Sequence, residues 1–431
     1  MTELPPVAPS GVRSRLLAAR GSAGLWAIAD QSIVSVGSFL VTIVLARTLP
    51  ASEFGVFGVL LGVLVTATTA HTSLIGIPLM VLSANEDHRN QLPTVALAWT
   101  LVSGTVFSAV LVGAAVIVGR PGLIAFAVLA LLAGQFQETL RRSLMGRLEF
   151  SRATLGDAVS YVGQAAGVAA LAVLGELTLA RALLVMGVTS LAAAGLQYWQ
   201  VRPAVKGALF RPDLVRPFWQ LGKALIVVNG IGGLTVQSFP WLLAAFAGVA
   251  SVGSFQALLA VMGFTNPLML AVNSIITAEV ARAQSLEPAA RRGSEFAIAR
   301  RYAIAGGMPL LAYCALLSAF PSPILGLYFG TASVYRGLGP ELRIFVLFSI
   351  AQYGYFVVAG VLNARQDTKA LFRAQMASAL TVPLLAAPLI AAGSTLGAVI
   401  GAVISATVRG GVAGFGVLRG ARQPGSSRTL R

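Results

Sequence analysis

Cysteine and histidine are almost missing from this sequence, which has one cysteine and two histidines among 431 residues. A single cysteine excludes a disulfide framework and a cysteine-based metal site within the chain. Cys314 stands in an apolar run, so we expect it to be a small buried hydrophobe. His71 stands in another apolar run without cysteine or carboxylate ligands nearby in sequence, which argues against a metal site there. The sequence therefore predicts no metal and no other cofactor.

Charged residues are scarce as well, at 11% of the chain, whereas 56% of the residues are apolar and the mean hydropathy is +0.81. Soluble domains are less apolar and more charged. A bilayer-spanning helix needs about 20 apolar residues, and twelve runs are long enough. They lie near 23–46, 55–82, 93–118, 122–140, 153–174, 178–199, 218–247, 250–279, 303–327, 342–363, 371–392 and 395–418. The expected fold class is an all-α integral membrane protein with about twelve transmembrane helices.

One short pattern occurs in both halves of the sequence. Residues 45–60 read LARTLPASEFGVFGVL, and a weaker copy, AAFAGVASVGSFQALLAV, begins at Ala244. The copies align Gly55 with Gly253, 198 positions later, and each stands between the first and second apolar runs of its half. Duplicated membrane halves are typical of secondary transporters. Because each half crosses the membrane an even number of times, we expect two six-helix bundles related by a pseudo-two-fold axis along the membrane normal.

The repeat divides the chain into five parts. A proline-containing basic linker separates the halves, and no loop is long enough for a soluble catalytic domain. The expected parts are a cytoplasmic N-terminal arm (1–22), an N-terminal six-helix bundle (23–200), a cytoplasmic linker (201–221), a C-terminal six-helix bundle (222–418) and a basic cytoplasmic tail (419–431).

Basic residues outnumber acidic ones by 31 to 15, for a net charge of +16. With the N-terminus in the cytoplasm, 26 of the 31 fall on the cytoplasmic side, five of them counted with the C-terminal tail. The outer side receives only Arg47, Arg120, Arg181, Arg336 and Arg343. This asymmetry follows the positive-inside rule. It predicts a multi-pass protein of a bacterial inner membrane with both termini cytoplasmic, and it assigns the basic charge to anionic membrane lipid rather than to nucleic acid.

Sequence signatures of enzymes are missing. The chain has no Walker A loop, no glycine-rich dinucleotide turn after a strand, and no carboxylate pair in a large loop. We therefore expect a protein that is not an enzyme. Transport would then draw on an ion gradient or on the later removal of the product.

The first copy of the repeat resembles the first hairpin of the Wzx-type polysaccharide flippases, which carry O-antigen repeat units. In their pattern, L-A-R-x-L-G-P-x-x-F-G-x-Y, the Gly-Pro pair is replaced here by Pro50 and Ala51, and the tyrosine by Phe57. These flippases belong to the multidrug/oligosaccharidyl-lipid/polysaccharide exporter superfamily, which also holds the multidrug and toxin extrusion (MATE) transporters. The residues that match the pattern are Leu45, Ala46, Arg47, Leu49, Phe54 and Gly55.

The resemblance implies that the chain flips a polyprenyl-diphosphate-linked oligosaccharide from the inner to the outer leaflet by alternating access. It implies coupling to protons or sodium ions. It also implies contact with membrane lipid and with a polysaccharide polymerase or export proteins. A cation-coupled exporter of drugs or toxins on the same fold is the first alternative, and that function favours an acid-rich cavity.

A membrane-embedded glycan polymerase or glycosyltransferase is a second alternative. It would need a large external loop with catalytic residues, and the loop at 320–340 offers only Arg336. A major-facilitator transporter also has twelve helices, but its loop signature is absent from ANEDHRNQ at 84–91.

Asp30 is the strongest candidate for ion coupling, because an ionisable group at bilayer depth is costly and is retained for a reason. A carboxylate there can bind a proton reversibly. Gln31, Ser35, Ser38 and Thr42 share one helical face, a polar stripe expected to line a cavity or contact a partner helix. The alternative for Asp30 is a position in the inner headgroup zone.

Asp157, Glu138 and His71 are further candidates. Asp157 shares a helical face with Ser160, Tyr161 and Gln164, but the nearby basic loop offers it an ordinary salt bridge. Glu138 precedes two arginines by three and four residues, a spacing that explains it without function. His71 can exchange a proton near neutral pH, or it can be a neutral hydrogen-bonding residue between helices.

A diphosphate headgroup calls for a cation, and arginine binds phosphate oxygens bidentately. Arg47 is placed to receive the headgroup on the outer side and Lys223 to meet it on the inner side. The alternatives are a snorkelling arginine and a positive-inside anchor. Uncharged amides of the second half suit sugar hydroxyls but also join helices. These amides are Gln237, Gln256 and Asn273, with Asn229, Asn266 and Gln352 as further members.

Overall fold

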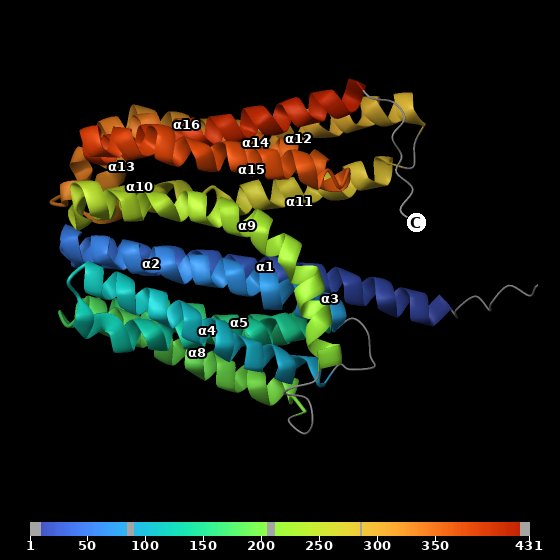
Figure 1. Ribbon diagram of the computed structural model, residues 1–431, viewed down its shortest axis with the longest axis horizontal. Coiled ribbons are helices and arrows are strands. Elements are labelled where there is room, and N and C mark those ends of the chain that lie inside the picture. The colour runs from blue at the N-terminus through green and yellow to red at the C-terminus, as the bar shows by residue number, and fades with distance from the viewer. Residues whose placement is uncertain (1–9, 84–89, 205–211, 285–286, 423–431) are drawn as a thin grey trace, which may run out of the picture.

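Long helices lie side by side in two bundles that follow one another along the chain (Figure 1). The computed structural model describes residues 10–83, 90–204, 212–284 and 287–422, and every regular element in these ranges is a helix. The first half forms the lower bundle of Figure 1 and the second half the upper one. Figure 1 therefore shows the two-bundle architecture that the repeat predicted.

The N-terminal bundle has six helical passes, two of which contain a turn of π-helix. Such turns occur mostly within α-helices and often near functional sites. Its elements are α1 (Ser10–Thr48), α2 (Ala51–His71) with η1 (Thr72–Gly76) and α3 (Ile77–Leu82), α4 (Leu92–Ile117), η3 (Pro121–Leu123) with α5 (Ile124–Gly146), α6 (Phe150–Asp157) with η4 (Ala158–Val162) and α7 (Gly163–Val173), and α8 (Leu179–Val201).

The C-terminal bundle repeats this plan with one short addition, α13. Its elements are α9 (Pro212–Ala247), α10 (Val249–Gly263) bent by 51° into α11 (Asn266–Ala283), α12 (Pro288–Ala319), α13 (Pro321–Phe329), η5 (Val334–Gly337), α14 (Gly339–Ala364), α15 (Thr368–Thr381) with η6 (Val382–Ala386), and α16 (Ala387–Arg422).

Nine helices of the described residues are long and apolar enough to cross a membrane, or ten when α10 and α11 count as one span. One of the nine, Thr368–Arg419, holds 52 residues and two crossings, because Ser394 breaks it with φ 55° and ψ −126°. The stretch Phe150–Val173 is a further pass that contains Asp157 and is less apolar. Together these passes account for the twelve expected from the sequence.

The two ends of the bundles differ in what they carry. We call the end with residues 10 and 422 the basic end, and the opposite end, with α13, the far end (Figure 1). At the basic end, Arg147 donates to the Val201 carbonyl at 3.1 Å, and Arg365 pairs with Glu295 at 2.5 Å. The first bond joins the end of α5 to the end of α8, and the second joins the end of α14 to α12.

Three expected boundaries differ from the structure. Helix α1 begins at Ser10, so the described part of the expected N-terminal arm is helical. Helix α9 begins at Pro212, within the expected linker, and residues 205–211 lie outside the described residues. Arg409, which the charge count placed with the tail, lies inside α16 and is 6% exposed. Proline at the first turn of a helix needs no N–H partner, which is why Pro212 starts α9 rather than ending it.

The bundles meet at the far end through a reciprocal pair of glycines. A Cβ on Gly55 of α2 would overlap the Val249 carbonyl oxygen, and a Cβ on Gly253 of α10 would overlap that of Ala51. Gly55 and Gly253 are 198 residues apart, as are Ala51 and Val249. Glycine is required at both positions because the helix backbones approach too closely for a side chain. The contact confirms the two-fold relation that the sequence echo indicated.

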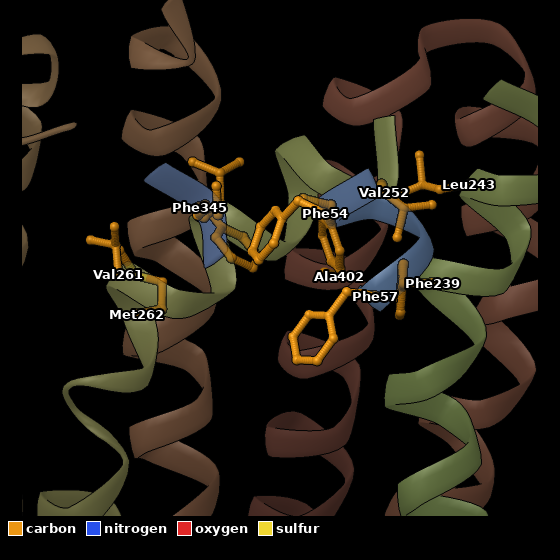
Figure 2. Close-up of a cluster of buried hydrophobic side chains, with 14 of the residues drawn as sticks. Phe54, Phe57, Phe239, Leu243, Val252, Val261, Met262, Phe345 and Ala402 are labelled. Carbon is orange, nitrogen blue, oxygen red and sulfur yellow. The ribbon is translucent and has the colours of Figure 1, made fainter. Parts of the chain in front are cut away.

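Aromatic side chains fill the space beside this glycine contact (Figure 2). Phe54 and Phe57 come from α2, while Phe239, Phe255 and Phe345 come from the C-terminal bundle. Phe57 and Phe255 occupy equivalent repeat positions, and each is 2% exposed. Interlocked rings of this kind close the far end between the bundles.

Candidate functional site

A polar cavity lies in the N-terminal bundle, with a volume of about 630 Å³. Its wall comes from α1, α2, η1, α5, η4, α7 and α8, with Asn229 of α9 closing one side. None of the described residues that line it is charged. Its polar residues are Ser38, Thr42, Thr68, Thr69, Thr72, Ser73, Gln135, Tyr161, Gln164, Ser190 and Asn229.

Two polar stripes predicted from the sequence reach this cavity. Ser38 and Thr42 line it from α1, and Tyr161 and Gln164 line it from the fifth pass. Gln164 donates to Ser160 at 3.0 Å. These side chains leave a wall of hydroxyls and amides, which can donate and accept hydrogen bonds without carrying charge.

Gln135 is the cavity residue with the most unused hydrogen-bonding capacity. It lies on α5, is 2% exposed, and neither its Nε2 nor its Oε1 has a partner in the described part of the chain. Leaving both ends of a buried amide unpaired is costly. The amide is therefore available to a ligand in the cavity. Gln135 was not among the predicted residues, and its place within an apolar run is the only signal of it in the sequence.

Another amide of the cavity wall, that of Asn229, donates to the Ser73 hydroxyl at 3.1 Å. This bond joins α9 to η1, so it links the C-terminal half of the chain to the cavity wall. Gly222 packs on the same turn, since a Cβ there would lie 2.9 Å from the Leu74 Cα. The beginning of α9 is therefore attached to the N-terminal bundle at the basic end.

Three candidate carboxylates converge on one guanidinium. Arg141 of α5 contacts Asp30 at 2.5 Å through Nη2, Asp157 at 2.5 Å through Nε and Glu138 at 3.1 Å through Nη1. Glu138 also pairs with Arg142 at 2.5 Å. The Asp157 contact is an ion pair without hydrogen-bond alignment. The Arg141 cluster, as we call these five residues, fastens α1, α5 and α6 together.

The charges of the Arg141 cluster do not balance. Three carboxylates face two guanidiniums, so the fully ionised cluster carries one negative charge in excess. Asp30 is 2% exposed and Asp157 fully buried. An excess charge in a low-dielectric site is stabilised by a proton or a bound cation. Ordinary salt bridges with nearby arginines, the alternative considered for Asp157 and Glu138, account for the contacts of these two residues. They do not account for the excess negative charge.

His71 has no contact with the cavity. Its Nε2 lies 3.1 Å from the Thr100 hydroxyl and 3.0 Å from that of Thr139, and the two hydroxyls are 2.6 Å apart. All three residues are fully buried. This geometry matches the alternative of a histidine that joins α2, α4 and α5 by hydrogen bonds.

The cationic candidates lie at opposite ends of the molecule. Arg47 donates to the Tyr328 carbonyl at 2.5 Å and to the Leu327 carbonyl, which caps the end of α13. It also borders a pocket of about 660 Å³ at the far end together with Arg336. Lys223 is exposed near the start of α9. Neither residue reaches the polar cavity.

Three of the remaining candidates contact neighbouring helices, and Gln31 bonds only within its own helix. Gln237 and Gln256 pack on the glycine face of α2, where Cβ atoms on Gly62 and Gly58 would lie 3.3 Å and 2.6 Å from them. Asn273 donates to the Phe356 carbonyl at 2.9 Å. Gln31 is exposed and donates to Ser35 at 3.2 Å. None of the ten residues predicted for the site lines the cavity, so their roles in binding and coupling stay predictions.

Comparisons with known proteins define the fold. No family model matches the sequence, and no curated protein does. An inward-facing multidrug resistance MATE transporter of the MOP superfamily superposes with a TM-score of 0.74 at 15% identity, covering 93% of this chain and 100% of the other. An outward-facing multidrug resistance MATE transporter superposes with a TM-score of 0.63 at 14% identity, covering 94% of this chain and 96% of the other.

A MOP superfamily transporter from Pyrococcus furiosus, described by a binding pocket of reverse polarity, gives a TM-score of 0.60 at 14% identity over 94% of this chain and 96% of the other. The chain is thus a multi-pass membrane protein with the fold of the MATE transporters of the MOP superfamily.

Proposed function

We propose that this protein is a membrane transporter that flips a polyprenyl-diphosphate-linked oligosaccharide from the inner to the outer leaflet by alternating access. The observation that carries the proposal is the uncharged, hydrogen-bonding cavity with the unpaired amide of Gln135. Sugars present many hydroxyls, and neutral amides and hydroxyls match them in both donors and acceptors. A cavity of about 630 Å³ also falls within the usual range for organic ligands, roughly 300–1,000 Å³.

The same cavity is poorly suited to an organic cation. Such a ligand calls for an unpaired carboxylate, and the carboxylates nearest in sequence to the lining belong to the Arg141 cluster, where guanidiniums hold them. Desolvating a cation against a neutral wall costs more than the wall returns. The lining therefore favours the glycan over the drug.

A lipid-linked substrate also needs an apolar path for its tail. A groove of about 620 Å³ between the bundles is lined by side chains of α2, α4, α9 and α10, among them Val63, Val110 and Trp241. It offers an isoprenoid chain an apolar surface beside the bilayer. The diphosphate would meet Lys223 at the basic end and Arg47 at the far end, as the sequence analysis expects.

The excess charge of the Arg141 cluster supports coupling to a proton or a sodium ion. With the basic end in the cytoplasm of a bacterial cell, the glycine contact closes the outer side and the structure faces inward. Asp30→Asn removes the excess charge while keeping the shape of the side chain. We expect this variant to fold and to lose ion-coupled transport in proteoliposomes, and coupling at the wild-type rate would exclude Asp30 as the ion carrier.

The decisive experiment is deletion of the gene in its host, followed by mass analysis of lipid extracts. We expect polyprenyl-diphosphate oligosaccharide to accumulate and surface glycan to disappear, with both restored by the wild-type gene. Gln135→Leu should fail to restore glycan although it reaches the membrane at normal level. Thr105→Val, at an exposed threonine of α4 outside the cavity wall, is the control and should restore it.

A cation-coupled exporter of small molecules is the second candidate. The observation that favours it is the likeness to multidrug resistance transporters. In that case the deletion leaves the lipid pool and the surface glycan unchanged and makes the cells sensitive to cationic compounds. This result would overturn the flippase proposal.

A further inference from the structure

Arg409 is a buried cation without a buried anion. It lies on α16 within the membrane-spanning part of the C-terminal bundle and is 6% exposed. Its Nη2 donates to the Gln352 side-chain oxygen, and its guanidinium stands over the Tyr355 ring at 4.4 Å. Its Nε has no partner among the described residues. A charge at this depth is costly unless something neutralises it.

No described carboxylate fulfils that role. Glu279 pairs with Arg301 at 2.6 Å, Glu295 pairs with Arg365 at 2.5 Å, and Asp367 caps α15. Gln352 and Tyr355 supply only a dipole and a ring face, which orient the guanidinium but leave its charge in place. Arg409 is therefore a positive charge without a compensating anion in the described part of the chain, whereas the Arg141 cluster has one negative charge in excess.

A small cavity with a mostly apolar wall and a few polar side chains adjoins the guanidinium. Its volume is about 20 Å³, and Arg409, Thr235, Ser378 and Ser405 contribute to its wall beside aromatic rings of α9, α10 and α14. One water-sized particle needs roughly 10–15 Å³ of such space. The cavity thus holds one monatomic ion or water and excludes a phosphate, a sugar or a carboxylic acid.

The wall also offers hydroxyl donors. The Ser378 and Ser405 hydroxyls are 2.8 Å apart, so one proton lies between them. The other hydroxyl proton is held only by long contacts of 3.2 Å to backbone carbonyls, and it can turn into the cavity. A guanidinium N–H and a hydroxyl are donors from which a halide accepts hydrogen bonds, and Arg409, Ser378 and Ser405 all line the same small space.

We propose that the C-terminal bundle binds a single chloride ion between Arg409 and the Ser378–Ser405 pair. The ion neutralises the guanidinium and receives the Nε hydrogen bond. A water molecule would fill the same volume but would leave the charge uncompensated. The inference concerns a site separate from the polar cavity, and it holds for either substrate class under the proposed function.

The test is the thermal stability of the purified full chain at constant ionic strength, with sodium chloride replaced by sodium gluconate. A ligand that binds only the folded state raises Tm with its concentration. We expect a saturable rise with chloride and with bromide, and none with sulfate, which is too large. Binding of ³⁶Cl⁻ should saturate at one ion per chain.

Variants locate the site. Arg409→Gln should abolish both the chloride-dependent rise and ³⁶Cl⁻ binding. Ser378→Ala should raise the half-saturating chloride concentration by about tenfold, because the loss of one hydrogen bond to a charged group typically has an effect of this size. Arg419→Gln, at an exposed arginine of the same helix that stacks on Phe415 at 4.9 Å, should behave as wild type.

Two results would overturn the proposal. The first is a wild-type Tm that is equal in chloride and gluconate, with no bound ³⁶Cl⁻. The second is an Arg409→Gln protein that binds chloride as wild type does. If Arg409→Gln does not fold, ³⁶Cl⁻ binding to wild type and its weakening in Ser378→Ala decide the matter.

Discussion

Replacing Gly55 by alanine should separate the far ends of the two bundles. Gly55 faces the backbone of α10, and its hydrogen-only side chain allows α2 to touch the Val249 carbonyl. The added methyl group has nowhere to turn, because the obstacle is backbone on one side and Gly253 on the other, whose nitrogen lies 3.1 Å from the methyl position. Relief comes only from moving one bundle relative to the other.

The size of the effect follows from the overlap. The new Cβ would overlap the Val249 carbonyl oxygen and stand 2.6 Å from the carbonyl carbon, whereas carbon atoms in contact prefer about 3.5–4.0 Å, so the helices must part by more than about 1 Å. Overpacking of this kind costs about 1–3 kcal/mol. If the open far end is free of the clash, the equilibrium between closed and open forms shifts by about 5- to 150-fold.

Distances between spin labels measure this shift. The single cysteine, Cys314, is buried, so Cys314→Ala gives a background for labels at Gly122 and Ala332, which are exposed at the far ends of opposite bundles. We expect Gly55→Ala to move the distance distribution from the short toward the long form. Gly253→Ala should do the same, because it occupies the equivalent repeat position.

The control is Gly195→Ala on α8, where an added Cβ meets nothing within 4 Å. Its distance distribution should equal that of wild type. The reasoning is refuted if Gly55→Ala and Gly253→Ala also leave the distribution unchanged, or if only one of the two shifts it, since the contact is reciprocal.

Three further outcomes are expected. Arg141→Met should cost about 3–5 kcal/mol of folding stability, because it leaves buried carboxylates unpaired. The loss should be seen as a smaller monodisperse peak on size-exclusion chromatography. The control Arg152→Met, at a 57% exposed arginine, should cost less than about 1 kcal/mol. His71→Leu should cost about 1–3 kcal/mol and keep transport; normal stability with lost transport would make His71 functional. Arg47→Ala should speed hydrogen exchange in α13, whose terminal carbonyls it caps, and lower export at normal membrane level; unchanged export would remove Arg47 from the transport path.

The arrangement of the passes was predictable because long apolar runs have few alternatives. In lipid the backbone must satisfy its own hydrogen bonds, so such a run is a helix that spans the bilayer. The echo of Gly55 in Gly253 predicted the two bundles, since equivalent residues of a repeat occupy equivalent places. The boundaries at Ser10 and Pro212 were less predictable, because polar helices at the basic end lack the apolar signal.

Residues of the site were harder to predict, and Gln135 and Arg409 show why. Each stands in an apolar run, where lipid-facing and protein-facing positions are equally apolar, so the sequence does not tell which face of the helix looks inward. The rotation of α5 and α16 about their own axes is set by packing against neighbouring helices. That rotation decides whether an amide lines a cavity or an arginine leaves the membrane.

The sequence by itself determined the membrane class, the duplicated halves and the candidacy of Asp30, Glu138 and Asp157, because hydropathy, repetition and buried charge are properties of the chain order. Only the tertiary structure decided that Asp30 and Asp157 join Glu138 at the same guanidinium, that of Arg141, and that Arg409 meets no carboxylate of the described residues. The contact between Asp30 and Arg141 joins residues 111 positions apart. Their distances depend on how whole helices pack, which no local pattern in the sequence encodes.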